Sequence, residues 1–201
     1  MSTYEDLRSR IEVDINRTDI TAQVQQQIKL AIKHYGTFPF WFNEARTTLT
    51  ASSSASFLTV PSDYLDIVEL YINVGDYPIK MEQKPLNEIV EYRPPSESQP
   101  GAFAYFADRF ELDYKVDQEY TFPLWYIQEL ATLSASSDTS LWTNQGEDLI
   151  VYRAEKMLFS NVLDDDRRAS KASVLERDAK VALLRFRDQK IGTGQAKPWG
   201  Y

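Results

Sequence analysis

The sequence predicts a mixed α+β protein with a helical bundle from both chain ends, an inserted antiparallel β region and an extended C-terminal tail. Three observations support this prediction. Apolar residues recur with a helical period near the start and again after about residue 146. Between these stretches the period falls to two, which is typical of strands. After a long charged stretch, glycines and a proline end the regular pattern. The expected parts are a bundle of residues 1–44 and 141–189, a β-rich insert of residues 45–140 and a tail of residues 190–201.

Two amphipathic helices are expected first. Thr3 followed by Asp6 resembles a capping box, with Asp in place of Glu or Gln, and predicts the first helix start. The second helix is expected to end at Gly36, where a helix C-terminal glycine would stand. Their apolar faces comprise Tyr4, Leu7, Ile11 and Ile15 in the first helix, and Ile20, Val24, Ile28, Ala31, Ile32 and Tyr35 in the second.

The β region begins with short segments of strand-like alternation. Residues 46–51 and 57–60 are predicted to pair around the polar turn at residues 52–54. A longer strand follows at residues 65–74, with apolar residues at every second position, and Gly75-Asp76 marks the turn after it. Its alternating residues are Val68, Leu70, Ile72 and Val74.

A short helix and a meander complete the insert. Pro85 is expected to open the helix, because proline is tolerated in a first turn. Residues 103–106, 110–116 and 120–130 are predicted to form an antiparallel meander. The clearest alternation is that of Phe110, Leu112, Tyr114 and Val116.

Two helices are predicted after about residue 146. Asp164-Asp165-Asp166 interrupts the first and caps the second, which is expected at about residues 168–189. Glu176 and Lys180, four residues apart, are expected to form an exposed pair. The predicted core face of the last helix comprises Ala172, Leu175, Ala179, Ala182, Leu183 and Phe186.

Composition excludes several classes of protein. The 201 residues carry 22 basic and 30 acidic side chains, a formal charge of -8, which argues against a surface wrapped tightly on nucleic acid. An acidic wall would still let DNA pass through a channel without sticking. The chain has no cysteine, so it has neither disulfides nor thiolate chemistry. We expect no membrane span, because no apolar run approaches about 20 residues, and no signal peptide at the acidic N-terminus.

No catalytic, cofactor or metal site is expected. His34 is the only histidine, and its place near a helix C-terminus favours a structural role over that of a general base. Asp164-Asp165-Asp166 is the best candidate for a hard cation, but adjacent aspartates at a helix start more often cap it. P-loop, dinucleotide-binding and nucleophile-elbow motifs are absent from the sequence.

The aromatic run Phe38-Pro39-Phe40-Trp41-Phe42 allows two interpretations. It could be a stacking platform for bases or sugars. We favour a plug between the bundle and the β insert, because the run holds no basic residue. Trp125-Tyr126 and Trp142 are expected to close the core from the other side.

Residues 190–201 are expected to be a docking tail. They are too polar to bury themselves, yet they end in large rings, whose burial in a neighbour's groove would offset the entropy of ordering the segment. A frayed end, or a segment folded back on its own domain, is the alternative. The candidate docking residues are Lys190, Gly192, Gly194, Lys197, Pro198, Trp199 and Tyr201.

Taken in order, several short motifs resemble those of the head-to-tail adaptor, or head-completion, proteins of tailed bacteriophages. The resemblance spans about residues 4–189, and it departs from the family pattern at Asp108-Arg109 and at Asp113-Tyr114-Lys115, where a glycine turn and prolines are expected. The motifs are Phe38-Pro39-Phe40-Trp41-Phe42, Phe57-Leu58-Thr59-Val60-Pro61-Ser62-Asp63-Tyr64-Leu65, Pro85-Leu86-Asn87-Glu88-Ile89, Tyr120-Thr121-Phe122-Pro123-Leu124-Trp125-Tyr126, residues 148–158 and residues 164–167.

The resemblance implies a structural virion protein of the neck, made in the host cytoplasm. It implies a ring, usually of about twelve copies, beneath the portal protein. The ring would extend the DNA channel without binding DNA specifically, retain the packaged genome and offer a platform for tail proteins such as a tube, a nozzle or fibre attachments. In such adaptors the C-terminal segment docks on the portal, and this role is carried onto residues 190–201.

Three other functions stay open from the sequence. A tail tube component, or another tail-side structural protein, is disfavoured by the long C-terminal helix pair and its tail. A carbohydrate- or ligand-binding module would use the rings of Trp125 or Trp41. A metal-dependent enzyme at Asp164-Asp165-Asp166 would require magnesium-dependent turnover, and we expect none.

Overall fold

The computed structural model describes the backbone of residues 1–191 and the side chains of residues 1–186. This part of the chain contains both helices and mainly antiparallel sheets, so the α+β class predicted from the sequence is confirmed. The chain divides into two compact units. We call them the helical unit, Met1–Asn43 with Glu129 onward, and the β unit, Glu44–Gln128.

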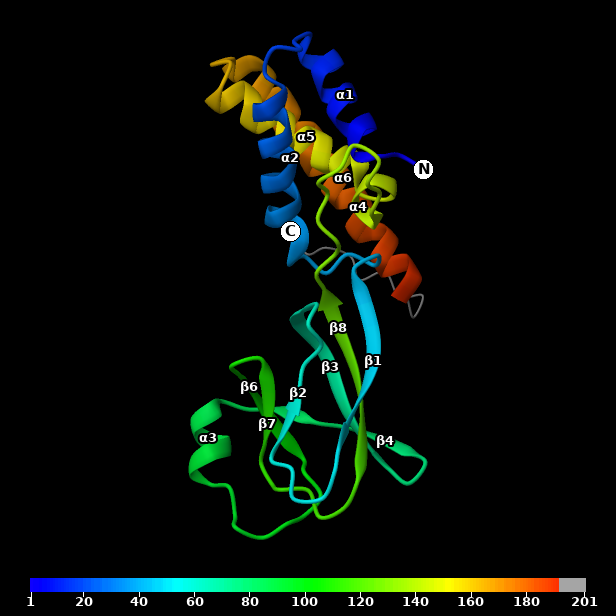
Figure 1. Cartoon of the computed structure of the whole chain (residues 1–201), viewed down its shortest axis with the longest axis vertical. Helices are drawn as coiled ribbons and strands as arrows, with labels where there is room; N and C mark the ends of the chain where they lie inside the picture. The colour runs from blue at the N-terminus through cyan, green and yellow to red at the C-terminus, as the bar shows by residue number, and fades with distance from the viewer. Residues whose placement is uncertain (192–201) are drawn as a thin grey trace, which may run out of the picture. The chain divides into compact units, whose positions relative to one another are not determined.

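The helical unit is built around α5, which packs against α1, α2 and α6 (Figure 1). α1 also packs against α2, and the short α4 packs against α5. The helices are α1 (Tyr4–Ile15), α2 (Thr21–Gly36), α4 (Leu141–Asn144), α5 (Glu147–Asn161) and α6 (Asp166–Ile191).

Local signals set the ends of α1 and α2. The capping box of Thr3 and Asp6 is confirmed, and α1 stops at Asn16, which adopts a left-handed conformation. The helix end expected at Gly36 is confirmed, because Gly36 is the last residue of α2, but no left-handed cap follows it, since Thr37 has right-handed torsion angles. The buried Asn43 side chain accounts for the difference. Its amide donates to the carbonyl oxygens of Gly36 and Phe38, at 3.1 and 2.8 Å, and so satisfies carbonyls that a left-handed glycine would otherwise serve.

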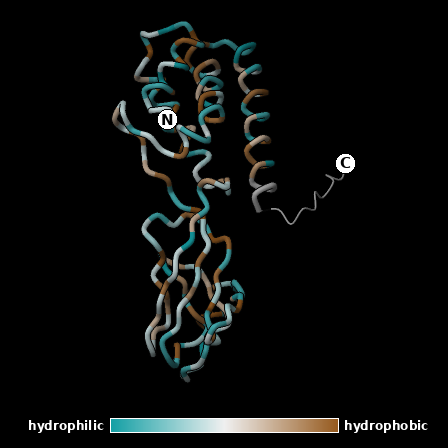
Figure 2. Tube along the Cα trace, turned by 90° about the vertical axis from the view of Figure 1, so that its right-hand side faces the viewer, coloured by the Kyte–Doolittle hydropathy of each residue, from teal (hydrophilic) through white to brown (hydrophobic). Residues whose placement is uncertain are grey.

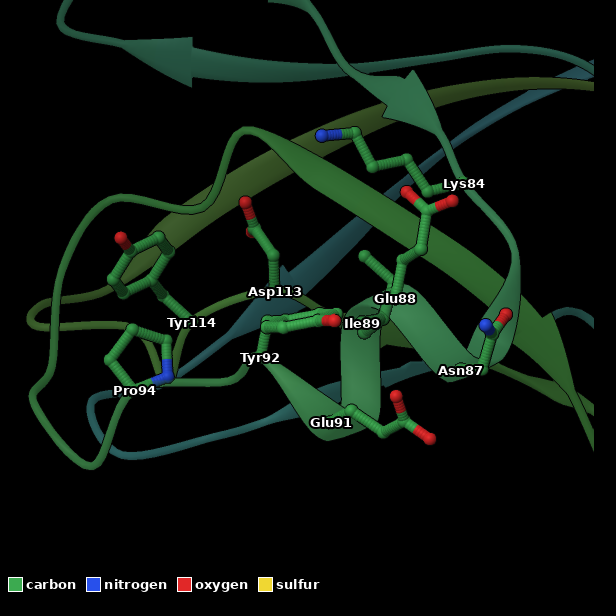
Figure 3. A pocket seen from close by; sticks show the side chains of 9 residues that line it. All are labelled: Lys84, Asn87, Glu88, Ile89, Glu91, Tyr92, Pro94, Asp113 and Tyr114. Atoms are coloured by element: carbon green, nitrogen blue, oxygen red, sulfur yellow. The ribbon is translucent and has the colours of Figure 1, made fainter.

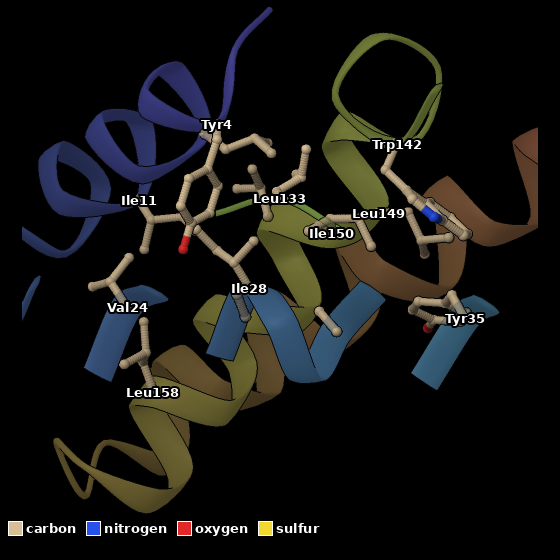
Figure 4. Packing of buried hydrophobic residues seen from close by; sticks show 14 of the residues in the cluster. Tyr4, Ile11, Val24, Ile28, Tyr35, Leu133, Trp142, Leu149, Ile150 and Leu158 are labelled. Carbon is tan, nitrogen blue, oxygen red and sulfur yellow. The ribbon is translucent and has the colours of Figure 1, made fainter. Parts of the chain in front are cut away.

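Side chains of five helices, α1, α2, α4, α5 and α6, meet in one apolar core, part of which is drawn in Figure 4. The stripes predicted for the first two helices lie in it, except for Ile32, which is only partly buried. Leu133, from the segment before α4, is also buried there. Residues 129–140 therefore belong with the helical unit rather than with the β-rich insert, whose expected end was residue 140.

The face that α6 turns to the core differs from the predicted one. Ala172 is buried and Leu183 is packed against the core, as expected. Ala182 is exposed, and Phe186 retains 55% of its exposure. The prediction that Glu176 forms a solvent-exposed pair with Lys180 is wrong, because Glu176 is only 5% exposed. The reason is that Glu176 has basic and phenolic partners inside the unit, which are described below.

The β unit contains two four-stranded sheets, in the orders β1-β8-β3-β4 and β2-β7-β6-β5 (Figure 1). All pairings are antiparallel except that of β5 with β6. A short helix, α3 (Leu86–Glu91), follows β5 and begins after Pro85, as predicted. The strands are β1 (Glu44–Ala51), β2 (Phe57–Thr59), β3 (Tyr64–Val74), β4 (Tyr77–Lys80), β5 (Glu82–Gln83), β6 (Ala102–Phe106), β7 (Arg109–Leu112) and β8 (Tyr120–Gln128).

Two of the predicted strand pairings are wrong. β1 and β2 are not partners, because β1 pairs with β8 and β2 pairs with β7 in the other sheet. The predicted meander holds only for the β6–β7 hairpin, since β8 pairs with β1 and β3. The alternation in residues 46–60 and 103–130 located most of these strands, but a period of two carries no information about the partner.

The β3–β4 hairpin turns at Gly75-Asp76 as predicted, with Gly75 at φ 61°. The alternation expected along β3 fails at Val68, which is exposed while Leu70 and Ile72 are buried. The pairing of β3 with β8 shifts its register between Ile67 and Glu69, so an extra residue stands on this strand. This bulge carries Val68 out of the apolar face.

The β6–β7 hairpin turns without glycine. Ala107 and Asp108 both have positive φ, 49° and 59°, which is the conformation of the two central residues of a tight hairpin turn. Behind this hairpin Arg93 ties the α3 connection to β7. Its Nη2 lies 2.8 Å from Oε2 of the buried Glu111, and its Nε donates to the Leu112 carbonyl at 2.9 Å.

Candidate functional site

A buried carboxylate fixes α6 in the helical unit. The Tyr35 hydroxyl of α2 donates to Glu176 Oε1 at 2.5 Å. From α5, Arg153 Nη1 lies 3.1 Å from the same oxygen, and Lys156 Nζ lies 3.0 Å from Oε2. The Glu176 side chain is 7% exposed, and those of Arg153 and Lys156 are 21% and 31% exposed. One residue of α6 therefore bonds to two other helices, and the Tyr35–Arg153–Lys156–Glu176 network links all three.

The electrostatics of this network favour an ionised Glu176. Burial alone would raise the pKa of its carboxyl, but the bonds from Tyr35 and Lys156 and the charges of Arg153 and Lys156 together lower it. Burial, and then the bond to Glu176, raise the pKa of the Tyr35 hydroxyl, which stays protonated as a donor. Partial burial of the His34 ring, and then the charge of Arg153, lower the pKa of this histidine, although the residue as a whole is exposed. The neutral imidazole packs against the rings of Tyr35 and Phe38, with centroids 4.7 and 6.0 Å away, and this arrangement fits the structural role expected for it.

The aromatic run after α2 lies beside this network. Lys180 Nζ is 3.8 Å from the centroid of the Phe38 ring, so the residue expected to pair with Glu176 makes a cation–π contact instead. Phe40 and Phe42 are buried in the core of the helical unit, with their centroids 5.9 and 5.0 Å from that of Trp142. These two rings are not a free stacking platform. That the aromatic run of residues 38–42 fills the space between the two units stays a prediction.

Trp125 does not present a bare ring either. The Arg46 guanidinium lies over it at 5.1 Å, and the Tyr71 ring meets it edge-on, with centroids 4.7 Å apart. The surface proposed for a sugar ring is therefore partly occupied by the protein itself.

The aspartates before α6 cap it. Oδ1 of Asp165 accepts from the Arg168 backbone N–H at 3.0 Å, which is the bond of an N-cap side chain. The capping interpretation of Asp164-Asp165-Asp166 is confirmed for Asp165. Within residues 1–191 no three His, Cys, Asp or Glu side chains gather in a way that could hold a metal ion.

Beyond the network, α6 carries apolar side chains on its solvent side. Val174, Val181 and Phe186 are exposed, and hydrophobic residues alternate with hydrophilic ones along the helix (Figure 2). The helix continues to Ile191, so Lys190, expected to begin the tail, has a helical backbone. Its side chain lies outside the described residues, as do the other candidate docking residues, Gly192, Gly194, Lys197, Pro198, Trp199 and Tyr201. Their docking role therefore stays a prediction.

The buried position of Glu176 could have been found from the sequence. Glu176 stands four residues after Ala172 and seven before Leu183, so helical spacing places it on the buried face. The charge of Glu176 favoured the solvent side and outweighed this signal. Its partners lie twenty or more residues away in the sequence, and no local pattern indicates them.

A family model described as SU10 adaptor protein matches residues 2–193, nearly the whole chain. The comparison with curated proteins found no match. Across residues 1–191, the helices are too short or too polar to cross a membrane.

Proposed function

Because the chain belongs to the SU10 adaptor protein family, a family of phage head-to-tail adaptors, we propose that it forms a ring between portal and tail. The ring, of about twelve copies, extends the DNA channel and retains the packaged genome. Family membership implies contact with portal and tail components and a place in the virion neck. The role is structural: the chain needs no cofactor and catalyses no reaction.

The single observation that carries the docking part of this proposal is the Tyr35–Arg153–Lys156–Glu176 network. It holds α6 against α2 and α5 through short polar bonds. α6 leads directly into residues 190–201, so the network gives that segment a fixed starting point. We propose that Trp199 and Tyr201 anchor this segment on the portal and that Gly192 and Gly194 let it bend.

Multiplicity makes a weak contact sufficient. A single segment of this length needs only modest affinity for the portal. When about twelve segments are tethered in one ring, each docking event raises the effective concentration of the next. The joint can therefore resist the pressure of packaged DNA without any strong individual contact.

The charge of the chain suits a channel wall. With 30 acidic and 22 basic residues, the protein has a net negative charge that on average repels the phosphates of DNA. DNA can therefore slide past it. A ring that bound DNA tightly would obstruct both packaging and ejection.

Electron cryo-microscopy of the full-length chain mixed with the portal ring tests the proposal. A ring of density on the portal is expected for the unaltered chain, and its loss is expected for the double variant Trp199→Ala/Tyr201→Ala. The matched control is Thr193→Ala/Gln195→Ala, which removes two polar side chains from the same segment and should leave the ring in place. If the ring forms equally with all three proteins, the aromatic anchors have no role. If no ring forms with any of them, the portal assignment is wrong.

A further inference from the structure

A cavity of about 570 Å³ opens on the β unit beside α3 (Figure 3). Its volume falls within the range of about 300 to 1,000 Å³ that is usual for ligand sites. The rings of Tyr114 and Pro94 lie at one end, Lys84 and Glu88 lie at the other, and Tyr92 and Asp113 lie between them. Asn87, Ile89 and Glu91 complete the lining.

The lining is acidic. Three carboxylates, those of Glu88, Glu91 and Asp113, face one ammonium, that of Lys84, whose Nζ already lies 3.3 Å from Glu82 Oε2. Glu88 and Glu91 have no ion-pair partner within the described part of the chain. Among the described residues, the Asp113 carboxylate accepts a hydrogen bond from the Gly101 backbone N–H alone, at 3.1 Å. A cation entering the cavity would therefore meet carboxylates that are not already neutralised.

The same cavity offers exposed apolar surface. Tyr92 retains 76% of its exposure, and the neighbouring Val90 is exposed as well. Tyr114 and Pro94 are partly buried and form a fixed wall beside them. Rings beside free carboxylates suit a short peptide that carries a lysine next to an aromatic residue or a proline.

We infer that this cavity binds residues 194–201 of a second copy of the chain. The stretch 190–201 contains Lys190 and Lys197 and no acidic side chain, in a chain whose acidic residues outnumber its basic ones. Lys197 is followed at once by Pro198 and Trp199. The charge and the ring content of the segment thus complement those of the cavity, with Lys197 meeting the carboxylates and Trp199 packing on Tyr92.

The contact joins two copies because each copy carries both halves of it. A cavity on one subunit and a segment on the next make a head-to-tail interface, which gives a ring where the rotation between copies closes and an open filament where it does not. The inference rests on the proposed function for the ring itself. The family match ends at residue 193, so membership assigns no partner to residues 194–201. Residues 194–201 of one copy cannot occupy both the cavity and the portal at once. They therefore stay in the cavity of another copy until they bind a portal.

Peptide binding tests the cavity directly. The probe is a fluorescent peptide of residues 190–201, and the receptor is the full-length variant Trp199→Ala/Tyr201→Ala, whose own segment lacks the rings. Fluorescence anisotropy should show saturable binding that weakens about tenfold or more with the added change Tyr92→Ala. The matched control is Tyr77→Ala in β4, which removes a tyrosine of similar exposure, 77%, outside the cavity lining and should leave the affinity unchanged.

A charge exchange distinguishes a specific pair from general attraction. The receptor change Glu88→Lys should weaken binding of the natural peptide about tenfold, and the peptide change Lys197→Glu should restore it. The exposed Glu119, which does not line the cavity, provides the control Glu119→Lys, for which no loss is expected. Absence of saturable binding, or equal losses at Tyr77 and Tyr92, would overturn the inference and leave the portal proposal untouched.

Cross-linking tests whether the contact forms between copies. The chain has no cysteine, so single cysteines report cleanly. A mixture of full-length Asn87→Cys and Gly200→Cys chains, in which Tyr92 and Trp199 are kept, should form a disulfide-linked heterodimer under mild oxidation, well above the yield with Tyr77→Cys in place of Asn87→Cys. Equal yields would overturn the contact. If no portal ring forms with any of the three proteins of the earlier experiment while cross-linking is intact, the proposed function alone is refuted.

Discussion

Replacing Glu176 with alanine should lower the free energy of unfolding of the helical unit by about 3 kcal/mol. The change removes the acceptor of the Tyr35 hydroxyl at 2.5 Å, a bond whose net worth is about 1 to 1.5 kcal/mol. It also leaves two cations without their carboxylate, which costs about 3 to 5 kcal/mol when a fully buried pair is broken. Arg153 and Lys156 keep 21% and 31% of their exposure, so water can serve them and the loss is smaller.

Urea unfolding followed by circular dichroism at 222 nm measures this difference, because the long helices belong to the helical unit. The control is Asp178→Ala on the same helix, where an exposed carboxylate pairs only with its neighbour Arg177 and a change within about 0.5 kcal/mol is expected. A loss below about 1 kcal/mol for Glu176→Ala, or an equal loss for Asp178→Ala, would show that the buried network does not stabilise the helical unit.

The pH dependence gives the same test a second arm. The folded pKa of Glu176 lies below its ordinary value of 4.5, so its contribution is fully present above that value. It is lost as the pH falls through the lowered folded pKa, where the carboxyl becomes protonated. The difference between the unaltered chain and Glu176→Ala should therefore be constant from pH 5 to neutral pH and shrink under more acidic conditions.

Three further predictions concern stability. The buried Glu155 has one oxygen without a partner, and burial, followed by the neighbouring Asp14 carboxyl, raises its pKa to about 8. In the folded protein Glu155 keeps a proton that the unfolded chain releases above its ordinary pKa of 4.5, so the free energy of unfolding falls as the pH rises towards 8. In urea titrations Glu155→Gln should therefore be more stable than the unaltered chain by about 2 kcal/mol at pH 8.5 and should differ little from it at pH 5. Gly146→Ala would place a Cβ 2.8 Å from the Trp142 ring and should cost about 1 to 3 kcal/mol, whereas Gly36→Ala meets nothing within 4 Å and should be neutral or gain about 0.5 kcal/mol, as thermal unfolding would show. Arg93→Ala removes one of the two cations that pair with the buried Glu111, while Arg109 stays 2.7 Å from its other oxygen, and should speed hydrogen exchange in β7 with a loss of about 1 kcal/mol in the β unit.

Local patterns accounted for most of the elements. The capping box at Thr3, the apolar stripes of α1 and α2 and the turn at Gly75-Asp76 each depend on residues within a few positions of one another. Such signals act before any tertiary contact exists. For these elements the sequence therefore predicts where each begins, and for α1 and α2 it also predicts the buried face.

Partners across the chain could not be predicted in the same way. The alternation of residues 46–51 fits any neighbouring strand, and only the structure shows that β8 takes that place. No left-handed cap follows α2, because the Asn43 amide, seven residues after Gly36, donates to the Gly36 carbonyl. The cavity beside α3 combines residues from Lys84 to Pro94 with Asp113 and Tyr114, and the sequence keeps these segments apart.

The buried charge at Glu176 also explains how α6 keeps its register. Around this residue the face of α6 is built from small side chains, Ala172 and Ala179, which fit equally well after the helix slides along its neighbours. A carboxylate that must meet Tyr35, Arg153 and Lys156 together fits at one position only, since any slide would leave an ion buried without its partners. An apolar residue at 176 could be as stable, but it would not choose among registers. Because α6 runs to Ile191, this choice determines where the segment after it begins in each copy of the proposed ring.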